Sequence, residues 1–197
     1  MNVFIGGSRA VSRLNPAIRA RVDDVIIRPG HTVLIGDANG ADKAVQQYLA
    51  ERRYPKVVVF CMKEPRNNVG GWATRNIEPP ADRKGFAYYA AKDSVMAKES
   101  KCGVMLWDGR SKGTLNNILT LVGAEKRALV YFSPTKEFYI LANGDDLQAL
   151  LARCEKGDLD AAARGLGLKN TAHAKPPAIS SCVSAVHAAA SCSPSAG

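Results

Sequence analysis

Three short segments of the chain combine glycine with side chains that can bind a charged or sugar-containing ligand. They are Gly6-Gly7-Ser8-Arg9, Gly36-Asp37-Ala38-Asn39-Gly40-Ala41-Asp42 and Asp108-Gly109-Arg110-Ser111-Lys112-Gly113-Thr114. Glycine lets a backbone approach a ligand closely, and an arginine can hold a phosphate through two parallel hydrogen bonds. A helix start adds unpaired N–H groups and a partial positive charge, which favour an anion. These segments therefore predict a site for a phosphorylated ligand, provided that the fold brings them together.

An apolar run precedes each segment, at residues 3–5, 32–35 and 104–107, and a stretch with helical spacing of its apolar residues follows. This order predicts a buried strand, a tight loop and a helix start. Two further apolar runs, at residues 56–61 and 128–132, predict two more strands. The alternation predicts an α/β fold, a three-layer Rossmann-like sandwich with a mainly parallel sheet of about five strands and helices on both faces. With right-handed crossovers and one reversal, the expected strand order is 3-2-1-4-5, and all three segments lie at the carboxyl edge of the sheet.

The first helix is expected to start near Asn15-Pro16, because proline is favoured at the first helical position. Residues 138–141 can add a short edge strand. Further helices are expected over residues 44–53, 83–101, 115–126 and 145–153, with one more short helix possible over 159–168.

Residues 62–82 show no convincing period and are predicted to form a long loop. Loops of this length in compact domains are commonly functional or disordered. Trp72 and Arg75, in a segment that contains glycine, suit a cover that stacks on a nucleobase. The alternative is that Trp72 pins the loop to the core.

The length of 197 residues predicts one folded domain, assigned to residues 1–154. From about Lys156 the composition shifts to Ala, Ser, Gly and Pro, so residues 155–197 are predicted to be a largely disordered tail. The net charge of +9 is compatible with nucleic acid or with phosphorylated small molecules. The basic residues are spread along the chain, which also fits a generally solvated basic surface.

No apolar run approaches the roughly 20 residues needed to cross a bilayer. The N-terminus lacks the basic start and long apolar core of a signal peptide, so a cytoplasmic location and no membrane partner are expected. The five cysteines form no C-x-x-C pair and have no histidine at metal-ligand spacing. No metal and no cofactor are therefore predicted.

Three carboxylates can take part in binding or in chemistry. Asp37 can accept hydrogen bonds from ribose, Asp42 can cap the following helix or act in chemistry, and Asp108 can contact a sugar or close its turn. Neither the G-x-G-x-x-G nor the G-x-x-x-x-G-K-[ST] fingerprint is present. Ser–His–acid catalysis has no support either, because His31 precedes a strand at its wrong end.

With these segments in view, residues 1–135 resemble the SLOG superfamily, which links DNA-processing protein A (Smf/DprA) to the lonely-guy nucleotide phosphoribohydrolases. The resemblance rests on the first strand with its G-S-R turn, on the G-x-x-x-G-A-D segment, and on a fourth-strand loop before a G-T helix start. In this chain these are residues 3–9, 34–44 and 107–114. The resemblance implies a Rossmann-like domain that binds a nucleotide or nucleotide-derived ligand, and relatives of this kind often dimerise.

Some relatives also cleave an N-glycosidic bond, and lonely-guy enzymes use the glutamate of G-G-x-G-T-x-x-E for it. Here Asn117 stands at the position of that glutamate. An amide can bind ribose but cannot serve as a general base or a carboxylate nucleophile. Another carboxylate can substitute for it, and the candidate catalytic residues are Asp42, Asp93 and Asp108.

We therefore expect a nucleotide-derived phosphorylated ligand at the carboxyl edge of the sheet. The alternatives are hydrolysis or transfer at the N-glycosidic bond of a nucleoside monophosphate, and binding of single-stranded nucleic acid as in the DNA-processing relatives. Nucleic acid is the less favoured partner, and a homodimer stays open. The candidate ligand-binding residues are Gly6, Gly7, Ser8, Arg9, Gly36, Asp37, Gly40, Asp42, Trp72, Arg75, Asp108, Gly109, Ser111, Lys112, Gly113, Thr114 and Asn117.

Overall fold

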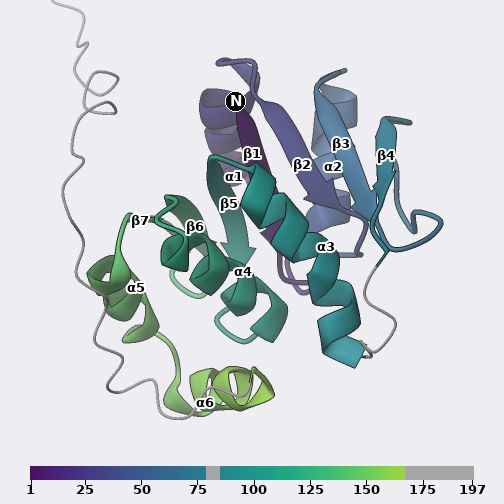
Figure 1. Cartoon of the computed structure of the whole chain (residues 1–197). Coiled ribbons are helices and arrows are strands. Elements are labelled where there is room, and N and C mark those ends of the chain that lie inside the picture. The colour runs from purple at the N-terminus through teal and green to yellow at the C-terminus, as the bar shows by residue number, and fades with distance from the viewer. Residues whose placement is uncertain (79–84, 167–197) are drawn as a thin grey trace, which may run out of the picture.

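A seven-stranded sheet runs through the middle of the computed structural model, which describes residues 1–78 and 85–166 (Figure 1). The strand order is β4-β3-β2-β1-β5-β6-β7, and every neighbouring pair is parallel except β6 and β7. The strands are β1 (Asn2–Gly7), β2 (Thr32–Gly36), β3 (Val57–Cys61), β4 (Ala73–Asn76), β5 (Cys102–Trp107), β6 (Ala128–Phe132) and β7 (Glu137–Leu141).

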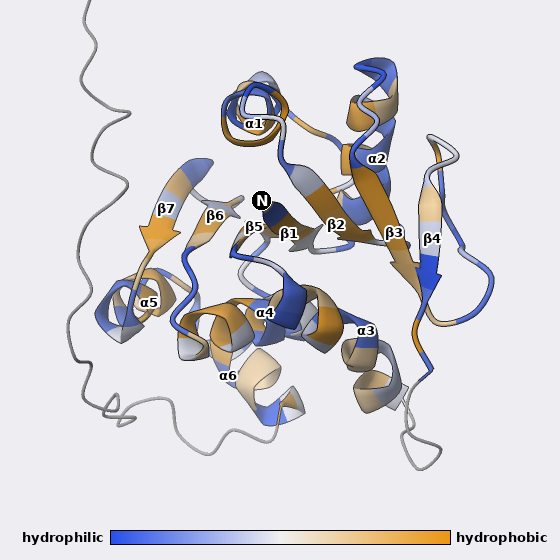
Figure 2. Cartoon of the chain, turned by 45° about the horizontal axis from the view of Figure 1, so that its top comes forward, coloured by the Kyte–Doolittle hydropathy of each residue, from blue (hydrophilic) through white to orange (hydrophobic). Residues whose placement is uncertain are grey.

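Helices cover both faces of this sheet, which confirms the predicted α/β sandwich (Figure 2). One face carries α1 (Pro16–Val22), its π-helical continuation η1 (Asp23–Ile27) and α2 (Ala41–Glu51). The other face carries α3 (Gly85–Glu99), α4 (Lys112–Gly123), α5 (Gly144–Leu151) and α6 (Lys156–Gly165). None of the helices in the described residues is long and apolar enough to cross a membrane.

The strand count and the complete order differ from the prediction at the two edges. The central strands β3-β2-β1-β5-β6 are the five predicted strands in their predicted order, but the sheet has one more strand on each side. The antiparallel strand β7 was expected as an option, whereas β4 lies in a segment predicted to be a loop. All four residues of β4 are exposed, so no alternation of apolar and polar side chains marks it in the sequence.

The reversal of strand order lies between β1 and β5, which pair in parallel from Val3 with Cys102 to Gly7 with Leu106. Gly7 is required at the end of β1, because a Cβ there would come within 2.5 Å of the Leu106 carbonyl oxygen and 2.7 Å of the Ala41 Cβ. The loops after β1, β2 and β5 leave the sheet at the same edge, as parallel strands require.

Local signals fix where several helices begin. The Asn15 side chain accepts a hydrogen bond from the Ile18 N–H, and Pro16 is the first residue of α1, so the predicted start is confirmed. Ser111 caps α4 by accepting from the Thr114 N–H. At the other end of the chain, α6 packs against α4, with Ala162 and Ala163 buried.

The described fold therefore continues past residue 154, where the sequence analysis placed the end of the domain. The remainder of the predicted tail, residues 167–197, lies outside the described residues.

Candidate functional site

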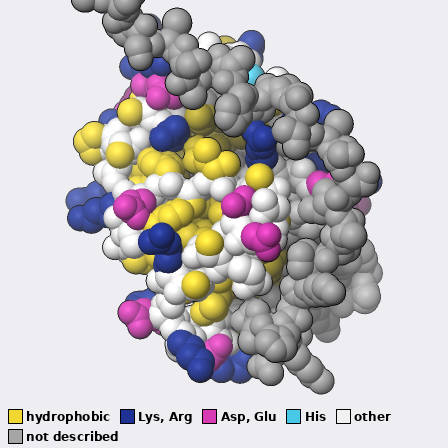
Figure 3. Space-filling view, turned by 90° about the vertical axis from the view of Figure 1, so that its left-hand side faces the viewer, with side chains coloured by type: hydrophobic (Ala, Val, Ile, Leu, Met, Phe, Trp, Pro, Cys, Tyr) yellow, Lys and Arg dark blue, Asp and Glu magenta, His cyan; other side chains and the backbone are white. Residues whose placement is uncertain are grey.

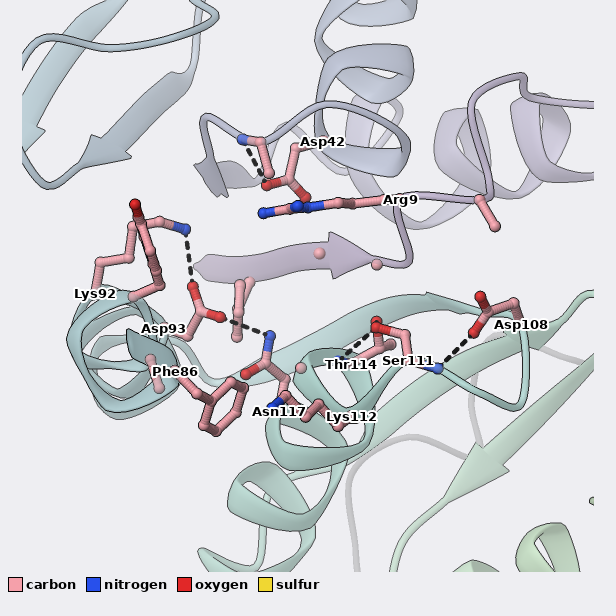
Figure 4. Close-up of a pocket in the computed structure, with 18 of the residues that line it drawn as sticks. Arg9, Asp42, Phe86, Lys92, Asp93, Asp108, Ser111, Lys112, Thr114 and Asn117 are labelled. Carbon is pink, nitrogen blue, oxygen red and sulfur yellow. Dashed lines mark hydrogen bonds and ion pairs between the residues drawn. The ribbon is translucent and has the colours of Figure 1, made fainter. Parts of the chain in front are cut away.

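A cavity of about 410 Å³ lies at the carboxyl edge of the sheet, beside the reversal point (Figure 4). Its size falls within the roughly 300–1,000 Å³ usual for small-molecule sites. All three glycine-containing segments reach it, so the fold brings together what the sequence analysis expected. The predicted ligand-binding residues that line it are Gly6, Gly7, Arg9, Asp42, Asp108, Ser111, Lys112, Gly113, Thr114 and Asn117.

A network of hydroxyl groups fastens the loop after β1 to the loop after β5. The fully buried Ser8 Oγ donates to Asp108 Oδ1 at 2.9 Å and lies 3.2 Å from Thr114 Oγ1. Asp108 Oδ1 also accepts from the backbone N–H groups of Arg110 and Ser111, at 3.0 and 2.8 Å. Asp108 therefore closes its turn while it also lines the cavity, and Ser8 supports the wall from behind.

The start of α4 gives the cavity a positive region. Among the described residues, the N–H groups of Lys112 and Gly113 have no hydrogen-bond partner, as expected in the first turn of a helix. Arg9 extends into the cavity, and neither Arg9 nor Lys112 forms an ion pair with a described residue (Figure 4). The Lys112 ammonium lies 4.8 Å from the centre of the Phe86 ring. These cations can neutralise an anion that enters the cavity.

A second part of the wall is formed by Lys92, Asp42 and Asp93, with Asp37 close behind them. Lys92 is only 5% exposed, and its Nζ lies 2.9 Å from Asp93 Oδ1 and 4.0 Å from Asp37 Oδ1. Burial alone would lower the pKa of Lys92, but the charges of Asp93, Asp42 and Asp37 outweigh it and raise the pKa. Lys92 is thus held as an ammonium. Gly36 makes room for the cluster, because a Cβ there would come within 2.7 Å of Lys92 Nζ.

Burial disfavours the charged form of Asp42. Burial raises its pKa to about 6, and the charges of Asp93 and Asp37 add to the effect, while Lys92 and the Ala38 N–H oppose it. The expected capping role is corrected by the structure. Gly40 is the N-cap of α2, and the Asp42 carboxylate accepts from the Ala38 N–H at 3.2 Å instead.

Asn117 and Asp93 form a pair within the cavity. The Asn117 Nδ2 group donates to Asp93 Oδ2 at 3.2 Å, so a carboxylate from α3 lies beside the amide from α4 (Figure 4). Asp93 therefore supplies an acidic group next to the residue that stands where the resemblance places a glutamate.

Asp37 does not line the cavity, because its carboxylate is already occupied. Arg66 donates to both of its oxygens, from Nε at 3.0 Å and from Nη2 at 2.8 Å. Burial would raise the pKa of Asp37, but the hydrogen bonds from Arg66 and the nearby Lys92 lower it. The expected contact with ribose is replaced by a structural one, in which Asp37 holds Arg66 at the cavity wall.

Trp72 and Arg75 also lie outside the residues that line the cavity. The Trp72 indole N–H donates to the Tyr54 carbonyl at 2.9 Å, and its ring packs against the hydrophobic core, as in the alternative stated above. Arg75 lies on β4, where it pairs with Glu99 at 2.6 Å. Their polar groups are satisfied elsewhere, so neither is placed to cover a base.

The remaining three predicted glycines and Ser8 support the site from outside the cavity lining. Gly40 has a φ of +90° and touches the backbone of Arg9, where any Cβ would overlap it. Gly109 has a φ of +79°, which a turn with ordinary side chains rarely adopts. Together with Gly36, these residues shape the loops that carry the lining side chains.

Eight residues that line the cavity were not among the predicted site residues, and four of them carry polar or aromatic side chains suited to a ligand, namely Arg66, Phe86, Tyr89 and Lys92; the other four are Phe4, Ala10, Ala38 and Ala90. Phe86 and Tyr89 have the helical spacing of apolar residues that usually point into the core. In the structure both line the cavity, and Tyr89 is 50% exposed. A signal did exist, since Phe86, Tyr89 and Asp93 share one face of α3 by their spacing.

Comparison with known proteins supports the fold and leaves the ligand open. No protein-family model matches the chain, and no curated protein does. A solved structure of DNA processing protein A from Helicobacter pylori is similar, with a TM-score of 0.53 and 14% identity over 85% of this chain and 80% of that chain. That structure was described for its mode of binding single-stranded DNA. At this identity the likeness shows a fold of the type that the resemblance implied.

Proposed function

We propose that the cavity binds a nucleotide or nucleotide-derived phosphorylated ligand. The observation that carries the proposal is the meeting, in one cavity, of Arg9, Lys112 and the N–H groups at the start of α4 that have no partner in the part of the chain that the structure describes. Backbone donors at a helix start together with unpaired cations form a favourable environment for phosphate. The adjacent aromatic and hydrogen-bonding side chains provide contacts for the rest of a nucleotide.

The cavity lining suggests a role for each group. Phosphate would be bound by Arg9, Lys112 and the first turn of α4. Asp93 would accept hydrogen bonds from ribose, and Asn117 would donate them to ribose. The nucleobase would stack on Phe86 or Tyr89. The centre of the Tyr89 ring also lies 5.6 Å from the Arg66 guanidinium carbon. In this proposal Phe86 and Tyr89 contact the nucleobase, which is the role that the sequence analysis expected of Trp72 and Arg75.

The test is a thermal-shift screen of nucleotides and nucleotide sugars, followed by calorimetry with those that raise the midpoint. A ligand that binds only the folded protein raises the midpoint by mass action. Arg9→Ala should weaken binding about tenfold or more, as expected for the loss of a charge-assisted hydrogen bond. Arg13→Ala is the matched control, because Arg13 lies exposed in the same loop and does not line the cavity. Equal effects of the two substitutions would contradict the proposal.

The pairing of Asp93 with Asn117 favours a second candidate, cleavage of the N-glycosidic bond. In that reaction water adds to C1′ of a nucleoside monophosphate, and the base leaves with a proton, which yields free base and ribose 5-phosphate. Asp93 would act as base or nucleophile, and Asp42, whose pKa is raised to about 6, would be the neighbouring acid. Simple binding predicts no release of base from common nucleoside monophosphates. Release that Asp93→Asn, Asp42→Asn or Asp108→Asn abolishes would establish the enzymatic reading instead.

The likeness to a protein that binds single-stranded DNA, together with the net charge of +9, motivates a third candidate, an oligonucleotide ligand. Such binding would be tight and would weaken steeply with salt. The face in Figure 3 shows basic side chains separated from one another and interspersed with acidic ones, rather than a continuous basic band. We favour the small ligand because the cations that would bind phosphate, Arg9 and Lys112, line a cavity. Oligonucleotide binding that a mononucleotide does not compete for would favour the third candidate.

A further inference from the structure

Strand β7 ends the sheet on one side, and part of its backbone has no partner among the described residues. Backbone groups along a strand alternate between its two neighbours. Arg127 and Ser133, which flank β6, bond to β5, so the odd-numbered residues of this segment face β5. The even-numbered residues of β6 therefore bond to β7, where their partners are the odd-numbered residues. The N–H and C=O groups of Phe138 and Ile140 consequently point outward from the edge of the sheet.

The side chains at this edge are apolar on the face that carries α1. Ile140 is 66% exposed, and its neighbour across the strand pair is the half-buried Leu129. Phe138 is also half-buried, with its ring centre 5.1 Å from that of Tyr131. Leu129 and Phe138 pack against the hydrophobic core of this face, so the core extends to the edge of the sheet. Figure 3 views the molecule from the side of β7 and shows apolar side chains exposed between separated charges.

The opposite edge of the sheet, formed by β4, is different. Its sequence is Ala-Thr-Arg-Asn, and all four residues are exposed, so it presents small and polar side chains. Natural edge strands commonly avoid pairing with other chains through charges, proline or a bulge. Between Glu137 and Leu141, β7 has no charged residue and no proline, and its register with β6 is unbroken. β7 is therefore the edge of the described sheet that is open to another strand.

We propose that β7 pairs in antiparallel fashion with β7 of a second copy of this chain. The two copies would be related by a two-fold axis, and their sheets would join into one continuous sheet. The same edge is then used by both copies, as a two-fold interface requires. No residue of β7 lines the cavity at the carboxyl edge of the sheet, so the pairing is independent of the proposed function.

The free backbone groups select the register of this pairing. Lys136 has a φ of +58° and lies outside the strand, and the Ala142 N–H already donates to a carboxylate of α5 at 2.8 Å. Phe138 and Ile140 are the residues of β7 whose backbone groups face outward. A two-fold axis at Tyr139 pairs each of them with the other in the second copy, and each such pair exchanges both of its N–H···O bonds.

This register also matches the side chains. Residues that lie directly opposite in an antiparallel pair share one face, so Ile140 lies beside the partner's Phe138, and apolar pairs of this kind stabilise sheets. Glu137 lies opposite the partner's Leu141, so no like charges meet across the strands. The contact thus covers the apolar edge without burying a charge against another of the same sign.

Sedimentation velocity of the full chain over a range of concentrations tests the pairing. The natural chain should form a dimer that dissociates on dilution, with a Kd on the order of micromolar, because a contact between single strands is small. Ile140→Lys should weaken the dimer about tenfold or more, since lysine at an edge opposes strand addition. Val69→Lys makes the same change of charge at an exposed apolar residue between β3 and β4, and is the matched control. A monomer at every concentration, or equal weakening by both substitutions, would overturn the proposal.

A cross-link identifies the surface without relying on Ile140→Lys. The two-fold axis places residue 139 opposite its own copy, and the Cα separation of about 4.5 Å in such a pair permits a disulfide. Mild oxidation of Tyr139→Cys should therefore join two copies through residue 139, as located by peptide mass. Thr135→Cys is the control, because it is exposed in the turn before β7 and the axis keeps its two copies apart. Efficient joining of Thr135→Cys through residue 135 would contradict the register.

Two further outcomes would overturn the dimer by assigning the edge or the interface differently. A monomer in which the introduced thiol links to Cys182 or Cys192 of the same chain would mean that residues 167–197 occupy the edge of β7. A dimer that Ile140→Lys leaves intact and that forms no link through residue 139 would place the interface on another surface. Circular dichroism establishes that Ile140→Lys is folded, and if it is not, the cross-link through residue 139 decides.

Discussion

The two halves of the cavity wall differ in how their charges are compensated. At the start of α4, Arg9 and Lys112 have no ion-pair partner among the described residues. Between α2 and α3, Lys92 is buried against Asp93 and close to Asp37. In the first half, the cations have no described counter-ion, so an anionic ligand could neutralise them. In the second half, the aspartates already neutralise the cation. Substitutions in the first half should therefore affect ligand binding, and substitutions in the second half should affect folding.

The largest effect is expected from Lys92→Met. Removing the buried ammonium leaves Asp42 and Asp93 without their cation, and breaking a buried ion pair on one side costs about 3–5 kcal/mol of unfolding free energy. Urea unfolding measures the loss, and Lys43→Met, at an exposed position of α2, is the control. Adding Asp42→Asn to Lys92→Met should recover part of the stability. A loss below about 1 kcal/mol would show that Lys92 does not neutralise the charges of Asp42 and Asp93.

Asp42→Asn alone should stabilise the protein at neutral pH, by an amount on the order of 2 kcal/mol. The folded-state pKa of Asp42 is about 6, above the ordinary value of 3.8, so the folded protein binds this proton more tightly than the unfolded chain. Stability supplied by Asp42 is thus fully present below pH 3.8 and is lost as the pH rises through 6.

Urea unfolding of both proteins at several pH values tests this sign. The advantage of Asp42→Asn over the natural chain should be greatest above pH 6 and should shrink as the pH falls towards 3.8. An advantage that grows on acidification would mean that Asp42 is stabilised as a carboxylate.

A smaller loss is expected from Ser8→Ala, which acts on the junction between the two halves. The Ser8 hydroxyl is fully buried and bonded to Asp108, so its removal should cost about 1–2 kcal/mol of unfolding free energy. Ser12→Ala, at an exposed position of the same loop, should cost almost nothing in the same urea titration. Equal costs would show that the bond between the two loops does not stabilise the fold.

The same contrast explains which parts of the molecule could be predicted from the sequence. The central strands were predictable because strands covered on both faces are nearly continuous apolar runs. The start of α1 at Pro16 and the cap at Ser111 were predictable because their signals are local. The three glycine-containing segments at the cavity were found for the same reason, since their glycines and polar side chains lie close together in sequence.

The buried half could not be predicted, because its members come from distant parts of the chain. Lysine is almost never fully buried, so nothing in the sequence marks Lys92 as part of a wall. Asp37 was expected to bind ribose, and only the fold shows that Arg66 occupies it. The edge strand β4 was missed because its exposed residues carry no apolar pattern. Pairings over long sequence separations required the structure.

The smallest effect on stability, and the one that most sharpens the contrast, is expected from Arg9→Ala. Because the Arg9 guanidinium has no described ion-pair partner, its removal should change the unfolding free energy by less than about 0.5 kcal/mol. Inorganic phosphate, added at millimolar concentration, should raise the melting temperature of the natural chain and of Arg13→Ala, but not that of Arg9→Ala. A substantial loss of stability in Arg9→Ala would mean that Arg9 interacts with other groups of the folded protein. The two halves of the cavity wall would then not differ in how their charges are compensated.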